Sequence, residues 1–386
     1  MSRILVTGGA GFIGSHTVMA LVELGYEVRV LDCLDPQVHG TNASFPSFLQ
    51  RIASCIYGDV CDLSTVQKAL KGVDAVYHFA ALTGVGQSLY DIRHYVATNC
   101  AGTATLLEAI LKNDLPISRL VLSSSRAVYG EGSYRCPSHG RVYPSARDRA
   151  QLEQGDFNIY CSQCDAPLIP LATEEMRPLM PISIYGWTKK AQEELCQQAV
   201  ESSDLPVTVL RYFNVYGAGQ SLQNPYTGVV SIFYSRLQAG QPIYLYEGGM
   251  PGRDFVHVKD VVHANLKALQ EDVPTGSCFN VGSGSNISIR DLAESLSHAT
   301  GCKVPLLDQG EFRVGDIHTC FADLTNSALS LKFKPKIRLQ AGLDEFVGWA
   351  GSEHCVDRYQ QTVEELNKYG FIGRGRLGSK SLKPQG

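Results

Sequence analysis

The chain has 386 residues, of which 44% are hydrophobic and 19% are charged, and its formal net charge at pH 7 is −4. This length allows one large α/β domain and a smaller lobe, and the slightly acidic charge argues against nucleic acid as a partner. No apolar run approaches the ~20 residues of a membrane-spanning helix, and a strand pattern begins at once, where a signal peptide would stand. We therefore expect a cytoplasmic protein without a membrane segment.

Short β-branched runs alternate with amphipathic stretches along the first half of the chain. The helical stretches are FIGSHTVMALVELG, AGTATLLEAILKN and GWTKKAQEELCQQAVES. Repeated β-α-β units of this kind predict an α/β fold with a Rossmann-type, doubly wound parallel sheet. The runs that predict its buried strands are 3–7, 28–32, 75–79, 119–123 and 207–212.

The stretch TGGAGFIG places Gly8, Gly11 and Gly14 between a predicted strand and a predicted helix. Small residues allow a pyrophosphate to approach the backbone, and the helix N-terminus offers oriented N–H groups. The next strand ends in Asp32, whose carboxylate can bind adenosine ribose hydroxyls and would repel a 2′-phosphate. We predict NAD binding, preferred over NADP, rather than a structural glycine turn. The further residues expected to contact the cofactor are Phe12, Ile13, Asp59, Val60, Phe79, Ala80, Ala81, Asn99, Tyr185 and Lys189.

A serine-rich strand end, SSSRAVYGE, precedes the helical stretch YGWTK, in which Tyr185 and Lys189 are one turn apart. A tyrosine with a pKa near 10 is a poor base at neutral pH. A lysine ammonium and the positive nicotinamide would favour its phenolate form, and a serine hydroxyl from the neighbouring strand end could relay or orient the proton. We predict that Tyr185 and Lys189 are catalytic together with a serine of this strand end.

Changes in composition suggest how the chain is divided. Residues 1–215 are expected to form the NAD-binding domain, interrupted at about 133–172 by an insert rich in Gly, Pro, Arg, Cys and Ser. Residues 216–370 are expected to form mainly a substrate-binding lobe, from which 253–281 returns to the first domain. The basic, Gly- and Ser-rich segment 371–386 is expected to be a flexible tail.

The motifs together resemble those of extended short-chain dehydrogenases/reductases of the NAD-dependent nucleotide-sugar epimerase/dehydratase family. The resemblance extends over residues 1 to about 335, apart from the insert. It implies a nucleotide-sugar substrate, a cytoplasmic homodimer and catalytic roles for Ser125, Tyr185 and Lys189. It also implies substrate contacts in RYFNVYG, GRDFVHVKD and RVGD, at Asn214, Arg253, Arg313 and Asp316.

The resemblance further implies the reaction. Tyr185 would remove the proton of a sugar hydroxyl, at C4, while a hydride passes to NAD, and the transient keto sugar would turn and take the hydride back on its other face. Dehydratases of this family carry an acidic pair directly after the catalytic hydroxyl, where this chain has Arg126 and Ala127. Without that acid the elimination lacks a proton donor, so we expect epimerisation.

The insert contains two short ligand-rich motifs, CPSHG and CSQC. Cys136, His139, Cys161 and Cys164 can close a tetrahedral zinc site that leaves no position open for a substrate. We predict a structural zinc that staples the insert, in preference to chance clustering. This knuckle, together with LDPQVHG, VGQSLYDI and NPYTGV, resembles the dTDP-L-rhamnose 4-epimerase branch of the family, which implies formation of dTDP-6-deoxy-L-talose for surface polysaccharide.

Three alternatives stay open. The enzyme could be a 4-epimerase of UDP-hexoses, or a 4-keto sugar reductase that exchanges its NAD(P)H at each turnover. From another class, the chain could be an NAD-binding sensor or scaffold. That last alternative predicts a damaged catalytic triad, whereas Ser125, Tyr185 and Lys189 are all present.

Overall fold

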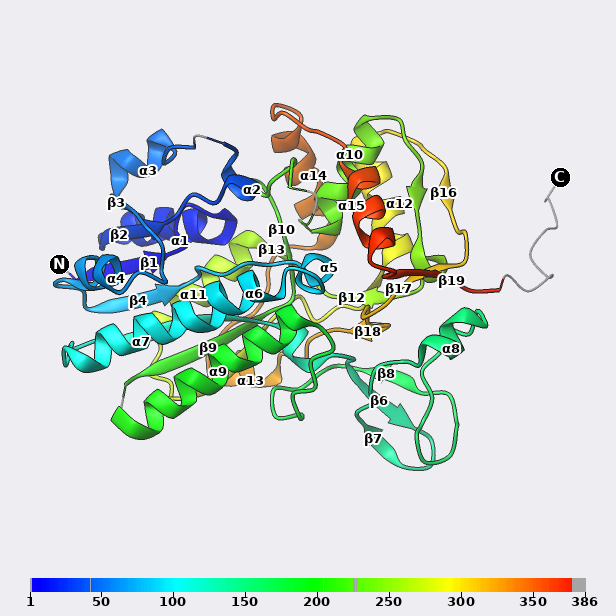
Figure 1. Cartoon of the computed structure of the whole chain (residues 1–386), viewed down its shortest axis with the longest axis horizontal. Coiled ribbons are helices and arrows are strands. Elements are labelled where there is room, and N and C mark those ends of the chain that lie inside the picture. The colour runs from blue at the N-terminus through cyan, green and yellow to red at the C-terminus, as the bar shows by residue number, and fades with distance from the viewer. Residues whose placement is uncertain (1, 42, 204, 225, 227, 377–386) are drawn as a thin grey trace.

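The computed structural model describes residues 2–41, 43–203, 205–224, 226 and 228–376. Its centre is a parallel seven-stranded sheet with the order β14-β9-β5-β4-β1-β2-β3 (Figure 1). The chain winds outward from β1 in one direction and from β4 in the other, which confirms the predicted doubly wound sheet. The strands are β1 Arg3–Thr7, β2 Glu27–Asp32, β3 Ser54–Tyr57, β4 Ala75–His78, β5 Arg119–Ser125, β9 Val207–Tyr212 and β14 Ser277–Val281.

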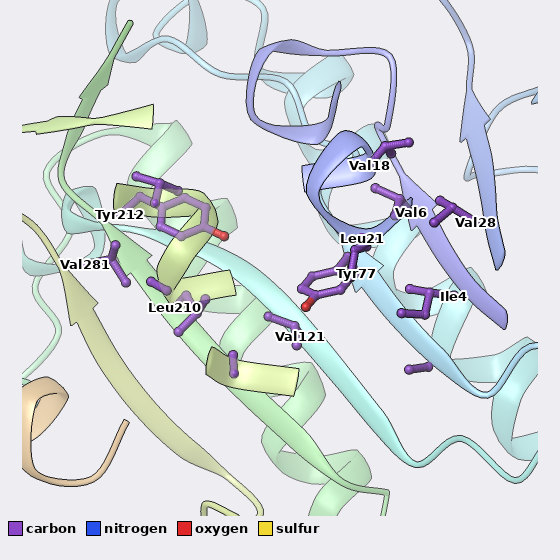
Figure 2. Close-up of a cluster of buried hydrophobic side chains, with 14 of the residues drawn as sticks. Ile4, Val6, Val18, Leu21, Val28, Tyr77, Val121, Leu210, Tyr212 and Val281 are labelled. Atoms are coloured by element: carbon purple, nitrogen blue, oxygen red, sulfur yellow. The ribbon is translucent and has the colours of Figure 1, made fainter. Parts of the chain in front are cut away.

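A hydrophobic layer covers each face of the sheet. In β1, Ile4 and Val6 face one layer and Leu5 faces the other, because successive strand side chains point to opposite faces. Figure 2 shows the first layer, in which Val18 and Leu21 of a helix lie over β1. The helices of this layer are α1 Phe12–Glu23, α3 Ser47–Ile52 and α11 Val258–Gln270, and those of the opposite layer are α4 Leu63–Leu70, α7 Gly102–Lys112 and α9 Ile184–Ser203.

The second half of the chain forms a smaller lobe beside the sheet (Figure 1). A separate hydrophobic cluster joins helices α10 Val229–Gln238, α12 Ile289–Thr300 and α14 Leu339–Ala350. Because β14 pairs with β9 and α11 packs on α1, part of this half of the chain belongs to the first domain. The short paired strands are β10 Asn214–Tyr216 with β13 Phe255–His257, β11 Ile243–Tyr244 with β16 Leu306–Leu307, and β12 Gly252–Arg253 with β15 Ile287–Ser288 and β18 Thr319–Cys320.

The C-terminal part closes on the lobe. Helix α15, Tyr359–Lys368, is followed by β19, Ile372–Arg374, which pairs antiparallel with β17, Glu311–Arg313. The first residues of the segment predicted to be a flexible tail are therefore a paired strand. Residues 377–386 lie outside the described residues, as do two positions, 225 and 227, of the NPYTGV motif.

The insert folds as a small unit that projects from the sheet, at the lower right of Figure 1. Its three-stranded sheet has the order β7-β6-β8. The elements are β6 Ser133–Cys136, β7 Gly140–Val142, β8 Ile169–Leu171 and α8 Arg149–Glu153.

The remaining elements are short connections: α2 Pro36–His39, α5 Val85–Ser88, α6 Ile92–Tyr95, the π-helical η1 Val96–Ala101, the 3-10 turns η2 Arg126–Tyr129 and η3 Tyr246–Gly249, and α13 Thr325–Leu329. Among the described residues, no helix has the length and apolar character required to span a membrane.

Candidate active site

A single cleft of about 1420 Å³ runs along the carboxyl ends of the parallel strands, where doubly wound folds bind their ligands. The glycine loop after β1 forms one end of it. Gly8 has a φ of +68°, and a Cβ at this position would lie 2.7 Å from the Ala80 nitrogen. A Cβ at Gly14 would lie 2.2 Å from the Gly8 oxygen. Only glycine fits either position, and no described side chain caps α1 at Gly11, so the N-terminus of α1 is available to an anion.

Asp32 ends β2 beside this loop and is 8% exposed. Its carboxylate accepts hydrogen bonds from the backbone N–H groups of Ala10 and Leu34, each at 2.9 Å. A carboxylate oxygen has two lone pairs, so both oxygens keep acceptor capacity for ribose hydroxyls. The residues around the loop therefore fit a dinucleotide with an unmodified ribose.

The other predicted cofactor contacts follow β3 and β4 or lie at the start of α1. Phe12, Ile13, Asp59, Val60 and Phe79–Ala81 all line the cleft.

Asn99 is placed differently from the other predicted cofactor contacts. It is fully buried and is not among the described residues that line the cleft. Its side chain accepts from the Leu82 nitrogen at 2.8 Å and donates to the Leu82 oxygen at 3.1 Å and to Thr188 Oγ1 at 2.9 Å. Asn99 thus holds the backbone of the loop after β4 against α9.

The three predicted catalytic residues lie together at the middle of the cleft. Ser125 is the last residue of β5, and its Oγ accepts from the Ala127 nitrogen at 3.2 Å. Tyr185 and Lys189 lie on the first turns of α9. The Lys189 ammonium donates to the Ser123 carbonyl oxygen at 2.8 Å, which fixes α9 against the end of β5.

Burial has the largest effect on the pKa values of Tyr185 and Lys189. Burial raises the pKa of Tyr185 above its usual value, while a hydrogen bond with Ser125 and the positive charge of Arg126 act to lower it. Burial also lowers the pKa of Lys189 to about 7, against the opposing effect of the Glu193 carboxylate. The influences that oppose the effect of burial on Tyr185 in this structure are Ser125 and Arg126.

Four predicted substrate contacts line the opposite end of the cleft. The Asp316 carboxylate lies 3.1 Å from Arg313 and 3.6 Å from Arg253, and these charges outweigh burial and lower the pKa of Asp316. Arg253 also donates to the carbonyl oxygens of Ile317 and His318, at 2.8 and 3.0 Å.

Two buried polar atoms at this end have no hydrogen-bond partner among the described residues, namely Asn214 Oδ1 and Arg313 Nε. Because unpaired buried polar groups are costly, this end is suited to a ligand that offers an acceptor, such as a phosphate oxygen, to Arg313 Nε and a donor, such as a hydroxyl, to Asn214 Oδ1.

Two tyrosines that no sequence motif indicated form an aromatic wall at this end. The Arg313 guanidinium lies 4.8 Å from the centre of the Tyr246 ring, whose hydroxyl is 3.4 Å from that of Tyr359 at the start of α15. All three side chains line the cleft. A single tyrosine in a 3-10 turn and another at the start of a helix form no sequence pattern, so no signal pointed to them.

The four predicted metal ligands converge in the insert. The Sγ atoms of Cys136, Cys161 and Cys164 and the ring nitrogen of His139 lie within 4.8 Å of one another. One pair of ligands comes from the turn between β6 and β7, where Gly140 has a φ of +71°. The other pair comes from a turn closed by the bridge between Tyr160 and Pro167. The structure therefore brings all four predicted ligands together in one Cys/His cluster.

Known proteins share the sequence pattern and the fold. The sequence model of the NAD dependent epimerase/dehydratase family matches residues 4–147 and 159–282, so that its gap falls within the insert. A dTDP-L-rhamnose 4-epimerase from Burkholderia thailandensis is 37% identical over 91% of this chain and 95% of its own length.

Solved structures superpose over nearly the same length. UDP-glucose 4-epimerase from Thermotoga maritima, determined with UDP-glucose, is 29% identical, has a TM-score of 0.72 and covers 90% of this chain and 98% of its own. UDP-glucuronic acid 4-epimerase from Bacillus cereus, determined with UDP-glucuronic acid and NAD, is 25% identical, has a TM-score of 0.71 and covers 90% of this chain and 99% of its own. The chain therefore belongs to the NAD dependent epimerase/dehydratase family.

Proposed function

We propose that this protein is an NAD-dependent nucleotide-sugar 4-epimerase that interconverts dTDP-L-rhamnose and dTDP-6-deoxy-L-talose. One observation carries the proposal: a single cleft joins the glycine loop, the Ser125, Tyr185 and Lys189 group and a cationic end. The choice of sugar is supported by the relative from Burkholderia thailandensis, a dTDP-L-rhamnose 4-epimerase that is 37% identical. The structural neighbours determined with UDP-sugars favour a UDP-hexose as the second candidate substrate.

The chain's own residues supply binding and proton transfer. Bound NAD would supply the hydride acceptor and then the hydride donor at the sugar carbon. Tyr185 takes the proton of the C4 hydroxyl and later returns it, and the hydroxyl of Ser125, which lines the same cleft, orients that proton. Arg253 and Arg313 bind the diphosphate, which leaves the sugar end of the substrate at Tyr185.

The residue after Ser125 separates epimerisation from dehydration. Elimination of water needs an acid within hydrogen-bond reach of the leaving hydroxyl. Arg126 and Ala127 stand at this place and both line the cleft, and neither can donate a proton as an acid at neutral pH. We therefore expect no accumulation of a 4-keto-6-deoxy sugar.

A substrate assay tests the proposal. Purified enzyme is incubated separately with dTDP-L-rhamnose, UDP-galactose and dTDP-glucose, and the products are identified by NMR. We expect the 6-deoxy-L-talose product from dTDP-L-rhamnose, without net use of NAD. Turnover of UDP-galactose alone would establish the second candidate, and a keto product from dTDP-glucose would establish a dehydratase. Stoichiometric consumption of NAD(P)H would establish a reductase, and NAD binding without turnover of any sugar would favour a sensor.

We also propose that the Cys/His cluster binds a structural zinc. Tetrahedral zinc, with bonds of about 2.3 Å to sulfur and about 2.1 Å to nitrogen, separates its ligand atoms by roughly 3.6 to 3.8 Å. The distances from Cys136 Sγ are 3.6 Å to Cys164 Sγ and 3.4 Å to His139 Nδ1, and that from Cys161 Sγ to His139 Nδ1 is 3.4 Å. Four protein ligands fill the coordination sphere, so the metal would stabilise the insert and take no part in the reaction.

Metal analysis checks this proposal. Protein purified without chelators should contain about one zinc per chain. The substitutions Cys161→Ser with Cys164→Ser should remove the zinc and lower the Tm by about 5 °C or more. The matched control, Cys55→Ser with Cys302→Ser, changes two half-buried thiols outside the cluster and should keep the metal. A wild-type protein free of zinc would exclude the metal from this account.

We also propose that the protein is a cytoplasmic homodimer. Light scattering of the purified protein should give twice the mass of one chain, and a monomer would contradict it.

A further inference from the structure

One buried arginine of the insert, Arg147, reaches the substrate end of the cleft. Its guanidinium donates to both carboxylate oxygens of Glu247, at 2.5 and 3.0 Å, and to the carbonyl oxygen of Asp316 at 3.2 Å. A bond of 3.1 Å to the Phe157 oxygen fixes the same guanidinium to the insert itself. The side chains of Arg147 and Glu247 are only 3% and 1% exposed. Water therefore screens this pair little, and its geometry is restrictive.

Glu247 and Asp316 both line the cleft, whereas Arg147 is not among the described residues that line it. The carboxylate of Asp316 holds Arg313 at 3.1 Å and Arg253 at 3.6 Å. Arg147 thus fixes the backbone of the residue whose side chain sets the positions of both substrate-end arginines.

Glu131, which directly precedes the insert, binds the next residues of the same segment. Its carboxylate accepts from the backbone N–H groups of His318 at 2.8 Å and Thr319 at 3.3 Å. It also lies 3.8 Å from the Nε of Arg147. Two successive parts of segment 311–319 are therefore held by charged groups in or next to the insert.

Packing makes a third connection between the insert and this segment. The ring of Phe157 lies 6.4 Å from that of Phe312, which is fully buried in β17. The nitrogen of Arg376, just after β19, donates to the Glu153 oxygen of α8 at 3.0 Å. Since β19 pairs with β17, and β17 contains Arg313, the insert supports both sides of the strand that carries a substrate-end arginine.

We propose that Arg147 is a positioning residue for substrate binding, and that the insert is thereby part of the frame of the substrate site. It keeps Asp316, Arg313 and Arg253 at the spacing that receives the diphosphate, an inference that rests on the proposed epimerase function. The catalytic residues lie on β5 and α9, outside this network. Loss of Arg147 therefore raises KM for the nucleotide sugar and leaves kcat and NAD binding nearly unchanged.

Kinetics of Arg147→Met test the proposal, with Arg141→Met as the matched control. Arg141 is another ion-paired arginine of the insert, but it bonds Glu174 and is half exposed. We expect Arg147→Met to raise KM on the order of tenfold, the effect of losing hydrogen bonds to charged groups, with kcat within about twofold of wild type. We expect wild-type KM for Arg141→Met. The Kd for dTDP or UDP, measured by calorimetry, should rise with KM, because the diphosphate needs no turnover to bind.

A double variant separates positioning from stability. Arg147→Met leaves Glu247 buried without its partner and destabilises the fold, whereas Arg147→Met with Glu247→Met removes both charges and should recover most of the lost Tm. The KM of the double variant should stay above that of the wild type. A double variant in which both the Tm and the KM return to wild-type values would overturn the proposal. If neither Met variant folds, Arg147→Lys tests the proposal instead. A single ammonium cannot bond both Glu247 and Asp316 as the guanidinium does, so we expect a raised KM for this variant. A wild-type KM for Arg147→Lys would overturn the proposal. Failure of the wild-type enzyme to turn over any nucleotide sugar would refute the proposed function. In that case the role of Arg147 is judged from binding alone: a Kd for dTDP or UDP that is the same in Arg147→Met as in the wild type would refute it.

Discussion

The glycine-loop end and the substrate end of the cleft are held in shape by different interactions. At the first end, Gly8 and Gly14 allow backbone to pack directly on backbone, and one carboxylate, Asp32, is held by neutral N–H groups. At the second end, buried ion pairs fix the wall, and Arg147 and Asp316 are 169 positions apart in the chain. Short-range backbone packing tolerates loss of a single side chain, whereas a buried charge left without its partner is costly. A single side-chain substitution should therefore affect the shape of the glycine-loop end less than that of the substrate end.

The largest effect is expected between the two ends, at Tyr185. Tyr185→Phe keeps the ring and removes the proton acceptor, so turnover should fall more than about 100-fold while NAD remains bound. Tyr95→Phe is the matched control, because its ring meets that of Tyr185 edge to face at 6.5 Å and its hydroxyl donates to the Thr83 oxygen. Steady-state kinetics and bound NAD measured after denaturation check both variants. Activity above about a hundredth of wild type in Tyr185→Phe would refute the role of general base.

A smaller effect is expected at the glycine-loop end, from Asp32→Ala. The substitution removes the carboxylate that would bind the ribose and leaves the N–H groups of Ala10 and Leu34 without acceptors. NAD affinity should fall about tenfold, and the preference over NADP should narrow. Asp32→Asn keeps an acceptor oxygen without the charge, so it separates the two effects. Calorimetric titration with both cofactors gives the comparison, and an unchanged preference would show that another residue recognises the ribose.

The same contrast explains what the sequence could predict. Five central strands follow from β-branched runs, but β3 and β14 lie at the sheet edges, and β3 has no fully buried residue, so its hydrophobic signal is weak. The glycine loop, Ser125 and the Tyr185 helix are local motifs, and the structure places them in one cleft.

Non-local interactions could not be predicted in this way. The tertiary fold brings together separate segments that contain Arg147, Glu131 and Glu247. No spacing in the sequence predicts that these three residues are in contact. Asn99 lies in a recognisable motif, but its amide is used by Leu82 and Thr188. A motif predicts where in the fold a residue lies, whereas the direction of its side chain depends on partners that lie elsewhere in the chain.

Arg126 connects the chemistry of the two ends. It follows Ser125 at the start of η2 and lines the cleft. Its positive charge opposes the effect of burial, which raises the pKa of Tyr185, and it contributes to the lowered pKa of Asp316. Arg126 is therefore a candidate for setting the pH at which the general base becomes active.

The smallest predicted effect follows from the sign of that interaction. A positive charge stabilises the phenolate of Tyr185, so Arg126→Gln raises the pKa of Tyr185 and reduces the phenolate fraction at neutral pH. The rising limb of the kcat profile should then move to higher pH, with a several-fold loss at pH 7 that is recovered in alkaline buffer. Arg126→Lys keeps the charge and should leave the profile in place. A loss of equal size at every pH in Arg126→Gln would instead mean that the guanidinium holds the sugar, because a contact with the substrate does not depend on the protonation of Tyr185.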